Sequence, residues 1–212
     1  LDPLQASIRL SDLAEVVVAG LYNATQREIE TTYGRLRRPD KDSGLVIIAL
    51  GKFGGQEMTL RSDLDLVFVY EAGDTEVSDG ARPQPPMMYY AKFAQRLITA
   101  LTVLTGEGLL YDVDTRLRPS GTKGPIAVKL EGFSAYQRKD AWTWEHMALT
   151  RARTVAGPAG LRARIDKEIH AILTGPRDFD KLRADVSSMR RLIGEEKPSR
   201  GPLDIKYRPG GL

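Results

Sequence analysis

The chain has 212 residues, a formal net charge of +3, no cysteine and two histidines, and its length suits one large domain or two small ones. The absence of cysteine excludes disulfides, thiolate catalysis and cysteine-bearing zinc sites, and it fits a reducing cytoplasm. The slight charge argues against a dedicated nucleic-acid-binding protein, and no apolar run is long enough to cross a membrane.

The first segment is predicted to be helical. Its opening residues, LDPLQASIRL, do not resemble a signal peptide and lack an initiator methionine, so we expect a cut within a longer chain. Asp12 and Glu15 have the spacing of a capping box, and apolar residues follow at helical intervals. We therefore predict a helix from about residue 12 to about residue 36, and we leave open an earlier one before it.

Two apolar strands and a long helix are predicted next. GLVIIAL, at 44–50, is a β-branched run typical of a buried strand, and DLDLVFVY, at 63–70, is a second. The segment after it, 71–86, is rich in glycine, proline and aspartate and predicts a loop. Apolar residues at helical spacing then predict a helix from the Pro85–Pro86 pair to about residue 105, ended by a glycine.

Shorter elements follow. LLYDVDTRLRP, at 109–119, predicts a third strand; PSGTKGP predicts a turn-rich loop; and IAVK, at 126–129, predicts a fourth strand. Helical patterns dominate from about residue 130 to about residue 193. DIKY, at 204–207, is typical of a last strand.

This order of elements predicts an α+β fold with a small mixed sheet, followed by helices. We divide the chain into a helical lead-in at 1–43, a core at 44–130, a helical segment at 131–193, and a linker with the last core strand at 194–212. No internal repeat interrupts this division.

Three aspartates are candidate metal ligands. Side chains alternate faces along a strand, so Asp63 and Asp65 point the same way. If the third strand is their neighbour, Asp114 converges on the same point. Three close carboxylates repel each other unless cations neutralise them, and with so few histidines the natural cation is a hard one such as Mg²⁺. Two such ions can clamp a phosphoryl group, activating the attacking hydroxyl and stabilising the departing oxygen.

Glycines beside this pair suggest a phosphate cradle. Gly54 and Gly55 follow a strand and precede QEMTL, which we expect to be a short helix, and a backbone without Cβ atoms can approach a phosphate closely. Ser62, just before the aspartates, offers a hydroxyl. The site is not a P-loop, because Lys52 is followed by phenylalanine and no GxxxxGK is present.

Each feature also has a structural interpretation. Paired aspartates are common in solvated turns, and a glycine pair is usually a tight turn. Trp142 and Trp144 are more often core anchors than stacking platforms, and His146 is more often a satisfied helix histidine than a base. Only the conjunction of strand, glycine pair, aspartate pair and a third acidic strand favours the functional interpretation.

That conjunction resembles the nucleotidyltransferase superfamily that includes DNA polymerase beta. Three segments, GKFGGQEMTLRSDLDLVFVYE, YDVDTRLRPSG and AWTWEHMALTRAR, are similar to the glutamine synthetase adenylyltransferases, whose chains carry an adenylylating half and an adenylyl-removing half. The turn RLRPSG and the helix WTWEHMALTRAR resemble the adenylylating half. The similarity runs from about residue 44 to the end, where the chain stops within a family segment.

The resemblance implies transfer of AMP from ATP to a tyrosine hydroxyl of glutamine synthetase, with release of pyrophosphate, in the regulation of nitrogen assimilation. It implies that Asp63, Asp65 and Asp114 bind two Mg²⁺ ions and that Asp114 can accept the tyrosine proton. It also implies that Gly54, Gly55 and Ser62 hold the triphosphate. The PII signalling protein is an implied partner of the full-length chain, and neither nucleic acid nor a membrane is expected.

Two arginines extend the ATP-binding set. Arg116 and Arg118 fall on the Asp114 face of the predicted third strand, so one is expected to balance the carboxylates and the other to touch the triphosphate; an equally good interpretation makes them structural ion-pair partners. Asp112 stays outside the catalytic set, because related chains often carry another residue there. The alternative functions are phosphorolysis of adenylyl-tyrosine, non-catalytic docking with the same fold, and, least favoured, a polymerase-like activity on nucleic acid.

Overall fold

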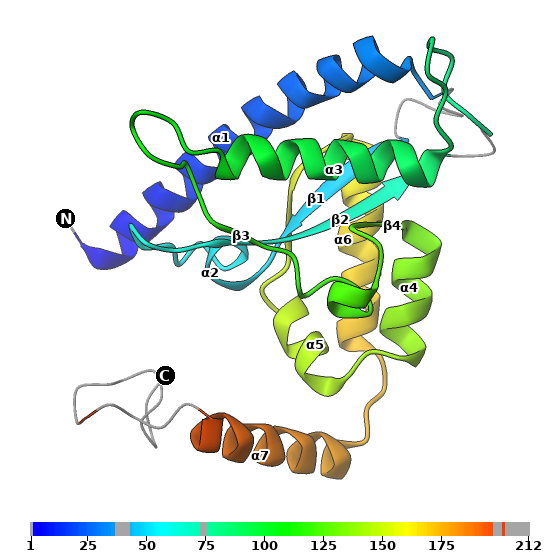
Figure 1. Ribbon diagram of the computed structural model, residues 1–212. Helices are drawn as coiled ribbons and strands as arrows, with labels where there is room; N and C mark the ends of the chain where they lie inside the picture. The colour runs from blue at the N-terminus through cyan, green and yellow to red at the C-terminus, as the bar shows by residue number, and fades with distance from the viewer. Residues whose placement is uncertain (1, 37–42, 73–75, 197–200, 202–212) are drawn as a thin grey trace.

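The computed structural model describes residues 2–36, 43–72, 76–196 and 201. Within these residues the chain forms seven α-helices, one 3₁₀ helix and a five-stranded mixed sheet (Figure 1), which confirms the α+β class. Among the described helices, none combines the length and apolar character that a membrane span requires.

The first helix, α1, spans Pro3–Tyr33. The Asp2 carboxylate accepts a hydrogen bond from the backbone N–H of Leu4 at 3.2 Å, and proline occupies the first helical position. The predicted start at Asp12 was wrong, because the aspartate–proline pair ten residues earlier is the actual cap and Asp12 lies inside the helix. The predicted helix and the earlier one left open are a single element.

The sheet is built on β1 (Gly44–Ala49) and β2 (Leu64–Glu71), which pair antiparallel. On the other edge of β1, β5 (Arg153–Ala156) also pairs antiparallel. Both β3 (Val113–Asp114) and β4 (Ala127–Lys129) run parallel to β2 and pair with different parts of it. The strands predicted at 44–50, 63–70 and 126–129 are thus confirmed to within a residue or so.

Two strand predictions need correction. The third strand was predicted at 109–119 and has only two residues, because the chain turns sharply after Asp114. The helical pattern expected over 130–193 is interrupted by β5, whose four residues join the sheet through backbone pairing with β1. The last predicted strand, 204–207, lies outside the described residues, and the division into domains stays a prediction.

The loop predicted at 71–86 loses its two end residues to β2 and α3, and its other described residues, 72 and 76–85, contain no helix or strand. The helix after it, α3, spans Pro86–Thr102 and ends three residues before the predicted end, with Leu104 largely exposed. The remaining helices are α2 (Gly51–Gly54), the 3₁₀ helix η1 (Gly121–Lys123), α4 (Leu130–Lys139), α5 (Thr143–Leu149), α6 (Ala159–Thr174) and α7 (Phe179–Glu196).

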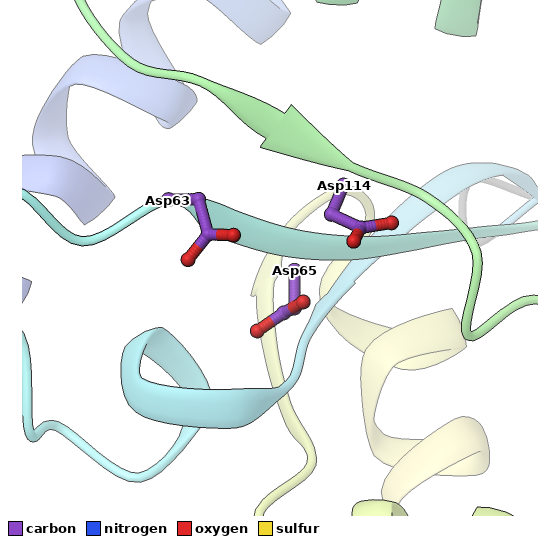
Figure 2. A group of neighbouring side chains, drawn as sticks. All are labelled: Asp63, Asp65 and Asp114. Atoms are coloured by element: carbon purple, nitrogen blue, oxygen red, sulfur yellow. The ribbon is translucent and has the colours of Figure 1, made fainter. Parts of the chain in front are cut away.

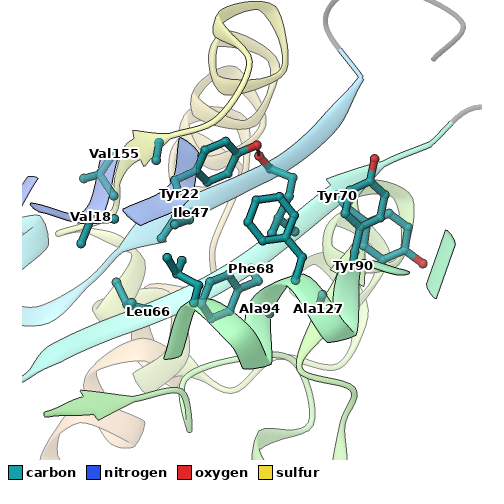
Figure 3. Packing of buried hydrophobic residues seen from close by; sticks show 14 of the residues in the cluster. Val18, Tyr22, Ile47, Leu66, Phe68, Tyr70, Tyr90, Ala94, Ala127 and Val155 are labelled. Carbon is teal, nitrogen blue, oxygen red and sulfur yellow. Dashed lines mark hydrogen bonds between the residues drawn. The ribbon is translucent and has the colours of Figure 1, made fainter. Parts of the chain in front are cut away.

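Both faces of the sheet are buried. On one face Ile47 and Phe68 pack with residues of α1 and α3, including Tyr22, in the cluster shown in Figure 3. On the other face the alternate β1 residues, such as Ile48, pack with α4 and α6 through residues such as Phe133. Burial on both faces explains why β1 is apolar at every position rather than at alternate ones.

Candidate metal and nucleotide site

The three predicted aspartates meet where β2 and β3 begin. The parallel pairing aligns Leu64 with Val113 and Asp65 with Asp114, so the two acids lie side by side. Asp63 directly precedes β2 and points the same way (Figure 2). One carboxylate oxygen from each aspartate lies within 4.8 Å of the others. The structure therefore brings these three side chains together. Alternation along the strand accounts for Asp63 and Asp65, and the pairing of β2 with β3, the condition of the prediction, accounts for Asp114.

The cluster carries an excess of negative charge. Burial raises the pKa of Asp65 to about 6, and the charges of Asp63 and Asp114 push it in the same direction. Arg116 acts the other way on Asp114: hydrogen bonds from its side chain lower the pKa of that carboxyl. One aspartate thus already has a protein cation, while Asp65 sits between two acids.

Arg116, in the turn that follows β3, is hydrogen-bonded to the Asp114 carboxylate. Its backbone N–H donates to Oδ1 of Asp114 at 2.8 Å, and its Nε donates to Oδ2 at 2.8 Å. The arginine side chain is 77% exposed, whereas that of Asp114 is 18% exposed. Arg116 therefore balances the carboxylate, one of the two interpretations of this residue, from a position open to solvent.

Arg118 is buried within the same turn. Its guanidinium donates to the carbonyl and the hydroxyl of Thr115 at 2.8 and 2.9 Å, and to the carbonyl of Gly124 at 3.2 Å. These contacts are structural, but all three acceptors are uncharged, so they are not the ion pair that the structural interpretation expected. They define what we call the Arg118 turn, residues 115–124. The shared strand face expected for Arg116 and Arg118 does not form, because this turn replaces the strand.

The glycine pair lies at the end of a helix rather than before one. The short α2 precedes QEMTL, which has no helix, so the expected order was wrong. A Cβ on Gly54 would lie 2.0 Å from the carbonyl oxygen of Arg151 and 2.6 Å from that of Ala49, so close backbone packing requires this glycine. Gly55 has only ordinary contacts around its missing Cβ.

Ser62 closes the turn that leads into β2. Its hydroxyl accepts from the backbone N–H of Thr59 at 2.9 Å, and its own N–H donates to the Thr59 carbonyl at 3.0 Å. Ser62 directly precedes Asp63 in the sequence, and its hydroxyl is hydrogen-bonded within this turn.

Gly51 is a site residue that sequence reasoning missed. Its φ is +54°, and a Cβ there would lie 2.0 Å from Oδ2 of Asp65. The backbone N–H of the preceding residue, Leu50, donates to the Asp65 carbonyl at 2.9 Å. The glycine directly after the first apolar strand was the available signal, because such a position often marks a close approach of the backbone.

Two arginines, Arg151 just before β5 and Arg153 at its start, contact α2 and the residues after it. Arg153 donates to the carbonyls of Phe53 and Gly54 at 3.3 and 3.4 Å and pairs with Glu15 of α1. Arg151 pairs with Glu57 at 2.6 Å. These contacts hold α2 and the turn at Gly54 and Gly55 against the sheet.

The segment AWTWEHMALTRAR contains one hydrogen-bonded histidine and two exposed tryptophans. His146 is the satisfied helix histidine that was expected, with one ring nitrogen 2.7 Å from the Gln137 carbonyl and the other 2.9 Å from an Arg177 nitrogen. The expectation that Trp142 and Trp144 anchor the core was wrong: they are 70% and 42% exposed. They line a groove of about 380 Å³ between α5 and α7.

Comparison with known proteins gives one consistent result. The family model for glutamate-ammonia ligase adenylyltransferase matches residues 2–168. A Brucella suis protein described as a bifunctional glutamine synthetase adenylyltransferase/adenylyl-removing enzyme is 47% identical over 99% of this chain and 21% of its own length. Proteins of the same description from Rhodopseudomonas palustris and Rhizobium meliloti are 46% and 45% identical over 98% and 99% of this chain.

The chain spans about a fifth of the length of these relatives. Its match to the family model nevertheless covers both acidic strands, the Arg118 turn and α5. The chain therefore belongs to the glutamate-ammonia ligase adenylyltransferase family of nucleotidyltransferase enzymes.

Proposed function

We propose that this domain transfers AMP from ATP to a tyrosine hydroxyl of glutamine synthetase in the cytoplasm, releasing pyrophosphate. The observation that carries the proposal is the convergence of Asp63, Asp65 and Asp114 within 4.8 Å. The relatives' description as adenylyltransferases of glutamine synthetase supports the substrate. The turn and helix resemblances favour the adenylylating direction.

The three carboxylates fit a divalent cation. All donors are oxygen atoms, which hard cations such as Mg²⁺ prefer. The pKa of Asp65 is raised first by burial and then by the charges of Asp63 and Asp114, so a bound cation would favour the ionised form of this carboxyl. Asp63, Asp65 and Asp114 would hold the Mg²⁺, with room for two ions as an expectation from the family. Bound Mg²⁺ would neutralise phosphate oxygens and ease ionisation of the attacking hydroxyl.

The transfer itself forms a bond between the tyrosine oxygen and the α-phosphorus and breaks the bond to the β-phosphate, so pyrophosphate departs. The tyrosine proton needs an acceptor, and we assign it to the Asp114 carboxylate. Because the Arg116 contact lowers the pKa of Asp114, this carboxylate becomes a better base once Arg116 has moved off it. The exposed Arg116 side chain can then contact the negatively charged triphosphate.

The remaining predicted ATP ligands have unequal support. Gly55 lies in the turn after α2, where its open backbone can face phosphate oxygens. Ser62 lies in the later turn that leads into β2, where its hydroxyl can do the same. Gly54 and Arg118 already have close protein contacts, so we propose that they shape the site rather than touch the nucleotide. The proposed ATP-binding contacts are thus Gly55, Ser62 and Arg116.

The direct test is incubation of the chain with Mg²⁺, ATP labelled in the α-phosphate, and glutamine synthetase. We expect label on the synthetase and release of pyrophosphate, and neither with Asp65→Asn. Asp112→Asn is the matched control, because this neighbouring exposed acid lies outside the cluster. No label with the wild-type chain would contradict the proposal.

The relatives' bifunctional description favours one second candidate, phosphorolysis of adenylyl-tyrosine by the same site. Incubation of adenylylated glutamine synthetase with the chain and inorganic phosphate would then give ADP. Mg²⁺-dependent nucleotide binding without either reaction would instead indicate a docking module. Any response to the PII protein would be sought in the longer chain of the relatives.

A further inference from the structure

Arg153, the last residue of the segment AWTWEHMALTRAR, has a side chain that the proposed reaction does not use. Each nitrogen of its guanidinium has an acceptor in the protein: Nη1 pairs with the Glu15 carboxylate, Nη2 donates to the Phe53 carbonyl at 3.3 Å, and Nε donates to the Gly54 carbonyl at 3.4 Å. Its Cζ also lies 5.7 Å from the centre of the Phe53 ring. An arginine engaged in this way holds α2 in place rather than offering a cation to a nucleotide.

The two carbonyls that Arg153 contacts lie at the C-terminal end of α2. Carbonyls at the end of a helix lack partners within the helix, and a nearby basic side chain can bond them. Arg153 is itself held on two sides. Its backbone is paired with Ala49, the last residue of β1, and Glu15 reaches its guanidinium from α1. The side chains of this ion pair are only 28% and 30% exposed, so the guanidinium has a fixed position relative to the sheet.

The opposite end of α2 contacts the aspartate cluster. A Cβ on Gly51, the first residue of α2, would lie 2.0 Å from Oδ2 of Asp65, so the backbone there limits where the carboxylate can lie (Figure 2). The N–H of Gly54 donates to the Leu50 carbonyl at 2.8 Å. The N–H of Gly55 donates to the Gly51 carbonyl at 3.1 Å, so a single helical turn connects the two ends. A shift at the end that Arg153 holds would therefore move the end that contacts Asp65.

We propose that Arg153 and Glu15 are positioning residues that hold the end of α2 and thereby fix the Gly51 backbone against the Asp65 carboxylate. The proposal rests on the proposed function of the aspartate cluster. It gives Glu15 a role other than the predicted capping box, because its carboxylate orients an arginine 138 residues later in the chain. It also links the segment AWTWEHMALTRAR to the cation site through protein contacts alone.

The test compares Arg153→Lys with Arg177→Lys in the 212-residue chain. Lysine keeps the positive charge, but its single nitrogen cannot reach the three acceptors that a planar guanidinium reaches. Arg177 is a matched control, because it donates to the Ile172 carbonyl at 3.0 Å in the last turn of α6. The control variant thus loses the same kind of contact, a bond to a carbonyl near a helix end, at a helix that carries no residue of the aspartate cluster.

Two quantities are measured for each variant. Hydrogen exchange, followed by NMR, compares the amides of Gly54 and Gly55 with those of β1, and calorimetry without nucleotide gives the Mn²⁺ affinity. In Arg153→Lys we expect the two α2-bonded amides to exchange at least about tenfold faster, with β1 unchanged, and Mn²⁺ binding to weaken by about three- to tenfold. The kcat of AMP transfer should fall with little change in the KM for glutamine synthetase. Arg177→Lys should keep the wild-type values.

Glu15→Gln is a second variant, which keeps an acceptor oxygen for Arg153 and removes the charge. It should change both quantities in the same direction and by less. The double variant should be no worse than Arg153→Lys, because the two residues act through one chain of contacts. If Arg153→Lys does not fold, Glu15→Gln alone carries the test.

The outcomes separate this proposal from the proposed function. Wild-type exchange of the Gly54 and Gly55 amides in Arg153→Lys, or faster exchange with unchanged Mn²⁺ affinity, would overturn the positioning role alone. Equal changes in Arg177→Lys would also overturn it, because they would reflect general destabilisation. Mn²⁺ binding by the wild type without AMP transfer would overturn the transfer function, while exchange and affinity would still decide the positioning role. A wild-type chain that binds no Mn²⁺ would overturn both.

Discussion

Asp65→Asn should stabilise the protein when no metal is present and destabilise it, relative to wild type, when metal is abundant. The pKa of Asp65 is raised from the ordinary value of 3.8 to about 6, which corresponds to about 3 kcal/mol for an unscreened group. Because Asp65 is only about half buried, solvent screening reduces this to about 1–1.5 kcal/mol. Asparagine has nearly the same shape and no charge, so the variant recovers that amount.

The sign follows from the direction of the shift. A carboxyl whose pKa is raised by folding favours the folded state below pH 3.8, and this contribution is lost as the pH rises to about 6. The stability advantage of Asp65→Asn should therefore be absent near pH 4, grow between pH 4 and 6, and stay constant above. In metal-free solution at pH 7.5 it corresponds to a rise in melting temperature of about 2–5 °C.

The assay is urea unfolding at several pH values, with chelator and then with Mg²⁺ in excess. Mg²⁺ at about a hundred times its dissociation constant should stabilise wild type by about 2.7 kcal/mol and should hardly affect Asp65→Asn, so the order of stability reverses. Asp112→Asn, as the matched control, should change by less than about 0.5 kcal/mol in either condition. Metal-free Asp65→Asn that is less stable than wild type, or equal stabilisation of both by Mg²⁺, would refute the reasoning.

Three further predictions concern the same cluster. Gly51→Ala should lower the free energy of unfolding by about 1–3 kcal/mol and reduce Mn²⁺ affinity at least about tenfold, because the new Cβ meets the Asp65 carboxylate at a left-handed φ. Chemical denaturation and calorimetry measure the two effects. The control Gly106→Ala, with open space around its Cβ, should keep the wild-type Mn²⁺ affinity. Arg116→Gln should raise Mn²⁺ affinity a few-fold by freeing Asp114 yet raise the KM for ATP, as steady-state kinetics would show; unchanged values for both would contradict the counter-ion role. Mn²⁺ affinity of the wild type, measured by calorimetry, should fall below about pH 6 as Asp65 gains a proton; a pH-independent affinity between pH 5 and 7 would contradict this.

The buried strands and the shared face of Asp63 and Asp65 were predictable because they depend on local patterns. The β1 run is apolar throughout and bounded by glycines, and its burial on both faces matches that reading. Asp63 and Asp65 share a face because alternation is a property of any strand. Asp114 joins them through the pairing of Asp65 with Asp114; this was the condition of the prediction, and no local pattern shows it. The pairing holds even though the predicted strand, 109–119, is much longer than the two residues of β3.

The missed features depend on contacts between distant residues. The four residues of β5 are a strand because β1 offers an edge, and a pattern this short within helical sequence does not reveal that. The need for glycine at position 51 comes from a carboxylate fourteen residues later. Trp142 and Trp144 were placed in the core on residue type alone, whereas α5 turns Glu145 and Leu149 inward and leaves the tryptophans outside.

The central claim is that the three aspartates form one cation site. Crystals of the chain soaked in Mn²⁺ can be measured at a wavelength where manganese scatters anomalously, which locates each ion without assumptions about its ligands. The account predicts an anomalous peak within coordination distance of carboxylate oxygens of Asp63, Asp65 and Asp114, and no such peak in Asp65→Asn. Manganese bound elsewhere in the wild type, with none at these three residues, would contradict it.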